Sequence, residues 1–320
     1  MTTPLAPTGS NRSSNKFTLV YVLLFFVGVI ASGASSLLLP TPAQMAASAI
    51  TFIIAVVLWK FKGSEIIRRW LMALTILSAV RYIVWRATFT LNISDWFTAI
   101  FSLLLFSAEL YTVYTLIGFY FQIFSLDRSA ENIQTDPDFR PSVDVFIPTY
   151  NEDTDILRRT AVGALSMEYP NKTVYILDDG KRESMKELAD ELGVGYIVRE
   201  KNNHAKAGNI NNALKVTNGE LILILDADHV PVVTLLDKLT PFFKDEKVSL
   251  VQSPHRFMNP GPVERNVYLA GKVPFEQELF MQIVQVGNDY WNAAFFCGSA
   301  AVLRRSVLEQ IGGIAIETVT

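Results

Sequence analysis

Two carboxylates one residue apart, Asp226 and Asp228, follow the uninterrupted apolar run 221–225. Such a run is typical of a strand buried on both faces of a parallel sheet, and alternate side chains along a strand point the same way. Two oxygen ligands on one side suit a hard divalent ion that keeps some waters and shares a substrate diphosphate. An aspartate pair is also common in ordinary turns, so neighbouring motifs decide between the two interpretations.

Other polar groups also stand where predicted strands end. Thr149, Tyr150 and Glu152 follow the run 143–147, and Asp179 follows the run 173–177. The carboxyl ends of parallel strands form the ligand crevice of an open α/β sheet, so these groups are expected to converge with the aspartate pair. Lys206, among small residues at a predicted helix start, offers an ammonium to phosphate oxygens. The set predicts a nucleotide-diphosphate site with a metal ion.

Competing nucleotide motifs are absent from the sequence. It holds neither the P-loop pattern nor the glycine pattern of dinucleotide enzymes. A net charge of -3 gives no indication of a nucleic-acid partner. The single cysteine, Cys297, excludes an intramolecular disulfide, and three scattered histidines make a histidine-based zinc site unexpected.

The elements that must hold these groups alternate between strands and helices. Strands are expected at 143–147, 173–177, 195–198, 221–225 and 248–252, and helices at 154–167 (capped by Asp153), 182–192, 206–216 and 232–243. Short alternating units predict an α/β domain with a mostly parallel sheet between layers of helices.

The amino-terminal part is predicted to lie in a membrane. Half of the residues are hydrophobic (50%), and four apolar segments stand near the roughly 20 residues that a spanning helix needs: 17–39, 43–59, 70–91 and 96–124. A signal peptide is the alternative for the first segment, because basic residues precede it and small residues follow it. Three further apolar segments favour an anchor.

Basic residues predict the orientation of this anchor. Arg12 and Lys16 precede the first span, and the loop between the second and third spans is rich in lysine and arginine. Because positive loops stay on the cytoplasmic side, four spans place everything after residue 124 there. We expect a disordered tail at 1–16, four transmembrane helices within 17–124, a linker at 125–141 and a cytoplasmic domain at 142–320.

Two ionisable residues, Arg81 and Glu109, fall within predicted spans. Charged groups at membrane depth are costly unless paired or hydrated. They either serve packing, through one hydrogen bond or by reaching the interface, or face a water-lined or sugar-lined path.

Several motifs occur in a fixed order: VDVFIPTYNE at 143–152, DDG at 178–180, HAKAGN at 204–209, DAD at 226–228, QSPHRF at 252–257 and FFCGS at 295–299. Together with the preceding spans they resemble the processive glycosyltransferases of family 2, of the bacterial cellulose synthase catalytic subunit type. The resemblance implies a GT-A-like, mixed and mostly parallel sheet. It also implies transfer of glucose from UDP-glucose to the non-reducing end of a growing β-1,4-glucan, with inversion and with translocation across a plasma (bacterial inner) membrane.

The resemblance also implies roles for single residues. Asp226 and Asp228 would hold Mg²⁺ or Mn²⁺ as catalytic metal ligands, and the nucleotide would contact Thr149, Tyr150, Glu152, Asp179, Lys206 and Asp226. His255 and Cys297 would lie at the glucan acceptor. Taken alone, His255 is better explained as a core histidine with its hydrogen bonds satisfied, and the alternative for Cys297 is a small buried residue. Tyr290 and Trp291 either stack on a sugar or serve packing.

Family members continue from a Gly-Gly-Ile segment, here Gly312-Gly313-Ile314, to a Thr-Glu-Asp motif whose aspartate is the general base. The sequence in hand stops at Thr320, so we expect a domain incomplete at its carboxyl end and, by itself, inactive or nearly so. The expected partners are UDP-glucose, the glucan acceptor, the lipid bilayer and other synthase-complex subunits. The alternatives are a synthase of a different β-glucan such as curdlan, or a non-catalytic membrane protein that binds a sugar nucleotide.

Overall fold

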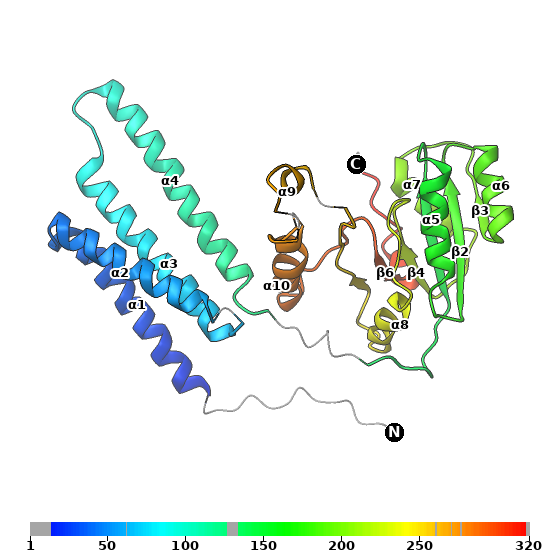
Figure 1. Cartoon of the computed structure of the whole chain (residues 1–320), viewed down its shortest axis with the longest axis horizontal. Coiled ribbons are helices and arrows are strands. Elements are labelled where there is room, and N and C mark those ends of the chain that lie inside the picture. The colour runs from blue at the N-terminus through cyan, green and yellow to red at the C-terminus, as the bar shows by residue number, and fades with distance from the viewer. Residues whose placement is uncertain are drawn as a thin grey trace. The chain divides into compact units, whose positions relative to one another are not determined.

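The computed structural model describes residues 14–61, 63–126, 134–259, 261–269, 271–275 and 277–317. Two compact units divide the chain, Met1–Leu126 and Asp127–Thr320, and each is described separately (Figure 1). Residues 1–13 of the predicted tail, Lys62 in the predicted basic loop and Thr320 lie outside the described residues.

The first unit is helical. Its helices are α1 (Ser14–Leu38), α2 (Thr41–Trp59), α3 (Glu65–Trp85), which continues into the π-helical turn η1 (Arg86–Thr90), and α4 (Trp96–Gln122). Within the described part of the chain, three helices are long and apolar enough to cross a membrane: Thr41–Trp59, Glu65–Thr90 and Trp96–Gln122. The described apolar part of α1, Phe25–Leu38, is shorter. The second, third and fourth predicted spans therefore have the length and hydropathy that a membrane-crossing helix needs. The first predicted span is a helix, α1, whose spanning length is not shown.

Close packing joins α1 to α3. The hydroxyls of Ser32 and Ser36 on α1 donate to the carbonyls of Leu77 (2.6 Å) and Arg81 (2.8 Å) on α3. A Cβ placed on Gly28 of α1 would touch Leu77 at 3.5 Å. Small residues let two helix backbones approach closely. Such close packing and interhelical hydrogen bonds are typical of helices in a membrane, where the hydrophobic effect does not drive association.

Arg81 and Glu109, which fall within predicted spans, have polar partners. Arg81 donates to the backbone oxygen of Gln44 on α2 at 2.5 Å. Glu109 on α4 pairs with Arg86 at 3.1 Å and accepts a hydrogen bond from the Tyr82 hydroxyl at 3.1 Å. Glu109 is thus paired with Arg86 of η1 and not with Arg81, and both charged side chains have the polar partners that charges at membrane depth need, whether they serve packing or face a path.

The second unit contains a mixed sheet with strand order β3-β2-β1-β4-β6-β5. Its strands are β1 (Val143–Thr149), β2 (Lys172–Asp178), β3 (Gly195–Ile197), β4 (Leu221–Ile224), β5 (Leu250–Gln252) and β6 (Ala301–Arg304). The pairs among β1, β2, β3 and β4 are parallel, and β6 runs antiparallel to both β4 and β5. The predicted mixed, mostly parallel sheet is confirmed, although β6 itself was not predicted.

Helices cover both faces of this sheet: α5 (Thr154–Leu165), α6 (Glu183–Leu192), α7 (Ala205–Leu214), α8 (Leu235–Leu239) and α11 (Arg305–Gln310). The helix predicted at 232–243 is shorter than expected. It ends at Leu239 and continues as the 3-10 turn η3 (Thr240–Lys244), because Pro241 has no N–H to donate to a helical carbonyl. Two short helices, α9 (Pro262–Asn266) and α10 (Gln285–Tyr290), occupy the segment before β6, and the π-helical turn η4 (Phe280–Val284) leads into α10.

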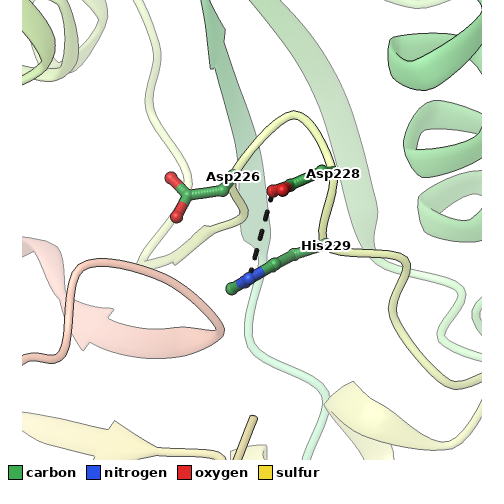
Figure 2. Close-up of side chains that lie close together, drawn as sticks. All are labelled: Asp226, Asp228 and His229. Atoms are coloured by element: carbon green, nitrogen blue, oxygen red, sulfur yellow. Dashed lines mark ion pairs between the residues drawn. The ribbon is translucent and has the colours of Figure 1, made fainter. Parts of the chain in front are cut away.

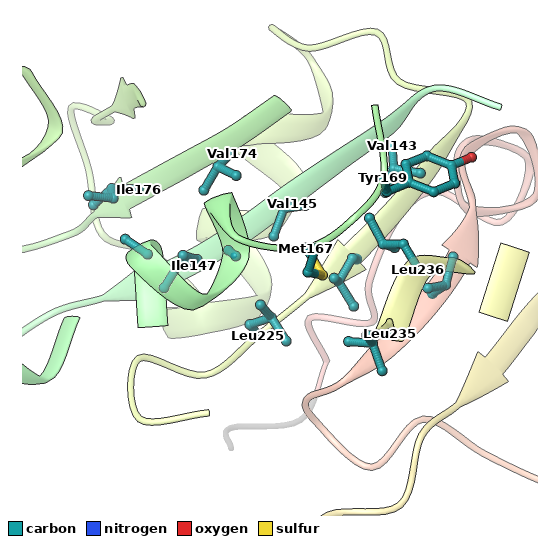
Figure 3. Close-up of a cluster of buried hydrophobic side chains, with 14 of the residues drawn as sticks. Val143, Val145, Ile147, Met167, Tyr169, Val174, Ile176, Leu225, Leu235 and Leu236 are labelled. Carbon is teal, nitrogen blue, oxygen red and sulfur yellow. The ribbon is translucent and has the colours of Figure 1, made fainter. Parts of the chain in front are cut away.

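The core lies on both sides of β1, every residue of which is buried. On one face Val145 and Ile147 pack with side chains from α5, α6 and α8 (Figure 3). On the other face Phe146 packs with Ile210 of α7 and Leu308 of α11. A strand buried on both faces is what the apolar runs predicted.

A buried ion pair fixes the amino-terminal end of β1 to α11. Asp144 of β1 and Arg305 of α11 lie 2.7 Å apart. Arg305 also donates to the carbonyls of Gly219 (2.5 Å) and Leu214 (2.8 Å), and the Gly219 N–H donates to Asp144 at 2.7 Å. Because both buried charges have hydrogen-bond partners besides each other, the ion pair can join β1, the loop before β4 and the end of β6 without leaving a buried charge unpaired.

Candidate functional site

The carboxyl ends of β1, β2 and β4 open into a pocket of about 490 Å³. Seven residues singled out in the sequence line it: Thr149, Tyr150, Glu152, Asp179, Lys206, Asp226 and Asp228. The wall also contains Asn202 and Asn209, which sequence reasoning did not select. The structure thus brings together groups that are up to 79 positions apart, as the topology of a parallel sheet requires (149 to 228).

The two aspartates lie on a turn and not on the strand itself, because β4 ends at Ile224. The His229 N–H donates to the Asp226 carbonyl at 3.0 Å, which closes the turn. Thr160 of α5 donates its hydroxyl to the Ala227 carbonyl at 2.7 Å. We expected the alternation of side chains along a strand to align the two carboxylates, and this explanation was wrong because neither aspartate is in the strand. The turn and its hydrogen bonds position the two carboxylates.

His229 adds a nitrogen to the two carboxylates (Figure 2). One potential ligand atom from each of Asp226, Asp228 and His229 lies within 4.8 Å of the others. The two carboxylates suit a hard ion such as Mg²⁺ or Mn²⁺, whereas an imidazole nitrogen is a softer ligand that Mg²⁺ seldom takes. Burial lowers the pKa of His229, with Asp226 opposing the shift, so the ring is neutral at pH 7 and able to bind a metal. Its position directly after the aspartate pair was a usable signal in the sequence.

Lys206 reaches the same turn from α7. Its ammonium pairs with the Asp226 carboxylate and donates to the Gly298 carbonyl at 2.5 Å. Gly298 has a φ of +92°, a conformation that L side chains rarely adopt, so a glycine is needed at the position whose carbonyl accepts from the lysine. The lysine therefore stands beside the candidate metal ligands in the wall of the pocket.

Asp179 at the end of β2 is held by an arginine that sequence reasoning missed. Arg199 binds both carboxylate oxygens, at 2.7 and 2.6 Å, and both side chains are only 8% exposed. Arg199 also donates to the carbonyls of Asn203 (2.6 Å) and Ala205 (2.8 Å). It therefore fixes Asp179 and the start of the helix that carries Lys206, while each carboxylate oxygen keeps a lone pair for a ligand.

Glu152 is fixed beside the end of β1. One of its oxygens accepts hydrogen bonds from the Thr149 hydroxyl and the Tyr150 N–H, each at 2.7 Å. Burial acts to raise the pKa of Glu152, but these hydrogen bonds outweigh it and hold the pKa below its usual value. The carboxylate is thus ionised at neutral pH and can accept a ligand's hydroxyl or N–H. Tyr150, 59% exposed, leaves its ring open at the pocket.

His255 and Cys297 line a second pocket of about 600 Å³, shared with Gln277, Phe280, Met281, Phe295 and Phe296. His255 Nε2 lies 2.9 Å from the Ser299 carbonyl oxygen. Burial raises the pKa of the Cys297 thiol, and a hydrogen bond from Gln285 partly offsets this. Tyr290 and Trp291 do not line this pocket; their rings meet edge to face at 5.1 Å.

The fold and the first pocket define the chain as a glycosyltransferase of the GT-A type. It belongs to glycosyl transferase family 2, whose model matches residues 144–312. It is 48% identical over 254 residues to cellulose synthase 2 of Novacetimonas hansenii (78% of this chain, 16% of the relative). It is 42% identical over 318 residues to the cellulose synthase 1 catalytic subunit (UDP-forming) of Komagataeibacter xylinus (97% of this chain, 42% of the relative).

The chain therefore spans less than half the length of these two curated relatives. Among solved structures it is similar to the mannosyltransferase PcManGT of Pyrobaculum calidifontis in complex with GDP-Man and Mn²⁺. That similarity has a TM-score of 0.44 and 22% identity, and it covers 58% of this chain and 51% of the other.

Proposed function

We propose that the first pocket binds UDP-glucose with Mg²⁺ or Mn²⁺, and that the protein transfers glucose with inversion to the non-reducing end of a growing β-1,4-glucan. The observation that carries this proposal is the convergence of Asp179, Lys206 and the two aspartates in one pocket at the ends of three strands. The cellulose synthase relatives support a β-1,4-glucan rather than curdlan as the product.

The nucleotide would extend from Tyr150 toward the aspartate turn. The exposed Tyr150 ring offers a stacking surface for uracil, and the ionised Glu152 and the arginine-fixed Asp179 accept hydrogen bonds from the base and the ribose. Thr149 acts through Glu152, whose carboxylate it holds. This arrangement selects the uridine end of the donor.

The diphosphate would lie between Lys206 and the aspartate turn. Asp226, Asp228 and His229 would hold a divalent ion, which when bound offsets the negative charge that grows on the UDP leaving group. Lys206 now neutralises Asp226. On binding, its ammonium turns to the phosphate oxygens and leaves Asp226 free as a ligand.

The acceptor end of the glucan would occupy the second pocket. Aromatic rings from Phe280, Phe295 and Phe296 line it together with His255 and Cys297. Aromatic faces bind the apolar faces of sugars, and the histidine supplies a polar contact. Translocation of the product and contacts with further synthase subunits belong to the same proposal; one relative is named a catalytic subunit, which supports the existence of further subunits.

The first unit would anchor the protein with its basic end in the cytoplasm. Arg68 and Arg69, at the start of α3, donate to the carbonyls of Ile123 (2.9 Å) and Phe124 (3.3 Å), where α4 ends. The chain thus leaves the helical unit at the same end as its basic loop. Because such loops stay on the cytoplasmic side, the glycosyltransferase domain would lie there too.

Binding of UDP to the purified chain in lipid nanodiscs, measured by calorimetry with and without Mn²⁺, tests the site. Asp228→Ala should abolish the metal-dependent part of binding, whereas Asp190→Ala, an exposed aspartate of α6, should leave it unchanged. Equal Mn²⁺ dependence in both variants would refute the assignment. Transfer of labelled glucose to a cello-oligosaccharide by the full-length protein then separates a transferase from a protein that only binds the sugar nucleotide.

A further inference from the structure

Ser299 lies two residues before the start of β6 and is fully buried. Its hydroxyl oxygen accepts the Asp226 N–H at 2.8 Å and lies 2.6 Å from His229 Nδ1. One side chain thus touches the backbone of the first aspartate and the ring that follows the second. No role for this serine was predicted from its motif.

The Ser299 hydroxyl and His229 Nδ1 lie within hydrogen-bond distance, and the tautomer of the ring decides which of the two donates. When His229 Nδ1 carries its proton and donates to Ser299, Nε2 keeps its lone pair, and Nε2 is the nitrogen that lies 4.0 Å from an Asp228 oxygen. A serine oxygen has two lone pairs, so it can accept from Asp226 and from His229 at once. In metal sites, a partner on the far nitrogen fixes the orientation and tautomer of a ligating histidine.

The backbone of Ser299 is fixed independently of the first pocket. The Ala300 N–H donates to the Ile224 carbonyl at 2.7 Å, which ties the segment to the end of β4. The Ser299 carbonyl accepts from Gln252 at 2.8 Å and lies 2.9 Å from His255 Nε2 in the second pocket. The Ser299 hydroxyl therefore contacts the aspartate turn from a segment that is hydrogen-bonded to β4 and to Gln252 and that also borders the second pocket.

We propose that Ser299 is a positioning residue for the metal and nucleotide site: its hydroxyl holds the Asp226 backbone and orients His229 so that Nε2 faces the two carboxylates. This inference rests on the proposed function, because it assigns the ligand geometry of that same pocket. It also places the support of the donor site on the segment that borders the proposed acceptor site.

Mn²⁺ affinity, read by electron paramagnetic resonance of the chain in nanodiscs, tests the proposal without any measurement of turnover. Ser299→Ala should weaken Mn²⁺ binding by about tenfold to 100-fold, the range typical of partners behind a metal ligand. Ser299→Thr, which keeps the hydroxyl, should retain most of the affinity. Thr240→Val removes another fully buried hydroxyl, bonded to the Leu236 carbonyl, and should leave Mn²⁺ binding unchanged.

A double substitution separates positioning from a general loss of stability. If Ser299 acts partly through His229, Ser299→Ala should cost a smaller factor in a His229→Ala background than in the unsubstituted chain. Equal factors in the two backgrounds, or unchanged affinity in Ser299→Ala, would overturn the proposal. If Ser299→Ala has no thermal unfolding transition, the same comparison is made with Ser299→Cys, which has nearly the same shape but bonds more weakly.

The outcome for the unsubstituted chain separates this inference from the function on which it rests. Failure of that chain to bind Mn²⁺ and UDP would overturn the proposed function and this inference together. Normal binding by both the unsubstituted chain and Ser299→Ala would overturn the inference alone.

Discussion

Lys206 has one anionic partner in the structure, the Asp226 carboxylate, and a second one in the proposed complex, the diphosphate. These roles make opposite demands on the lysine, because a cation that neutralises Asp226 competes with a metal ion for the same carboxylate. Its removal should therefore have effects of opposite sign on the two ligands.

Lys206→Met is expected to weaken UDP binding by about tenfold or more, since hydrogen bonds to charged groups are worth about 1.5–3 kcal/mol. The same variant should bind free Mn²⁺ more tightly than the unsubstituted chain, because Asp226 loses its competing cation. Calorimetry with each ligand separately checks both signs. Lys215→Met, an exposed lysine that does not line the pocket, is the matched control. A fall in both affinities would show that Lys206 only supports the fold.

The sequence predicted the pocket residues that belong to recognisable runs and missed those that act from a distance. Asp179, Asp226 and Lys206 stand at predicted strand ends or a helix start, so topology alone brings them together. Arg199 and Ser299 act through tertiary contacts with residues 20 and 73 positions away. No local pattern encodes such partners, and only the folded chain reveals them.

Among the secondary-structure elements, β3 is joined to β2 by a side chain as well as by the backbone ladder. The Tyr196 hydroxyl of β3 donates to Asp178 of β2 at 3.0 Å. Burial, and then the hydrogen bond to this carboxylate, raise the pKa of Tyr196 to about 12. Because an unfolded tyrosine ionises near pH 10, folding is favoured by this group below about pH 10.

The contribution of Tyr196 should be lost as the pH rises from about 10 to about 12, since the unfolded chain then releases its proton before the folded chain does. Tyr196→Phe should therefore lower the thermal midpoint at pH 8 and make it fall less steeply between pH 10 and 12. Scanning fluorimetry across this range checks the slope. Tyr290→Phe, at an exposed ring, should keep the unsubstituted slope. Parallel slopes for Tyr196→Phe and the unsubstituted chain would contradict the assignment.

Strand β6 is the strand of the sheet that the sequence did not predict. β1, β2 and β4 were predicted because apolar runs buried on both faces are distinctive. β6 is four residues long, and its last residue, Arg304, and the next, Arg305, are both charged, so its apolar stretch is too short to stand out. Its pairing with β4 is a long-range contact, which the hydrophobic pattern does not reveal.

On the scale of the whole molecule, the proposed orientation can be tested by the accessibility of single cysteines. In a Cys297→Ala background, Ile93→Cys between η1 and α4 should react with a membrane-impermeant maleimide in intact cells. Gly63→Cys, between α2 and α3, should react only after the membrane is permeabilised, because the positive loop stays inside. Labelling of Gly63→Cys from outside would invert the topology and place the glycosyltransferase domain on the wrong side for UDP-glucose.

The position of β6 inside the sheet bears on how the protein is made. β4 precedes β6 by almost eighty residues, yet β6 is its neighbour and supplies the support for the aspartate turn. During synthesis the edge of β4 that pairs with β6 therefore stays unpaired until residues 301–304 have left the ribosome. The apolar helices of the first unit have emerged before then. An exposed strand edge is a template for mispairing between chains, so we expect the nascent domain to depend on chaperones for that interval.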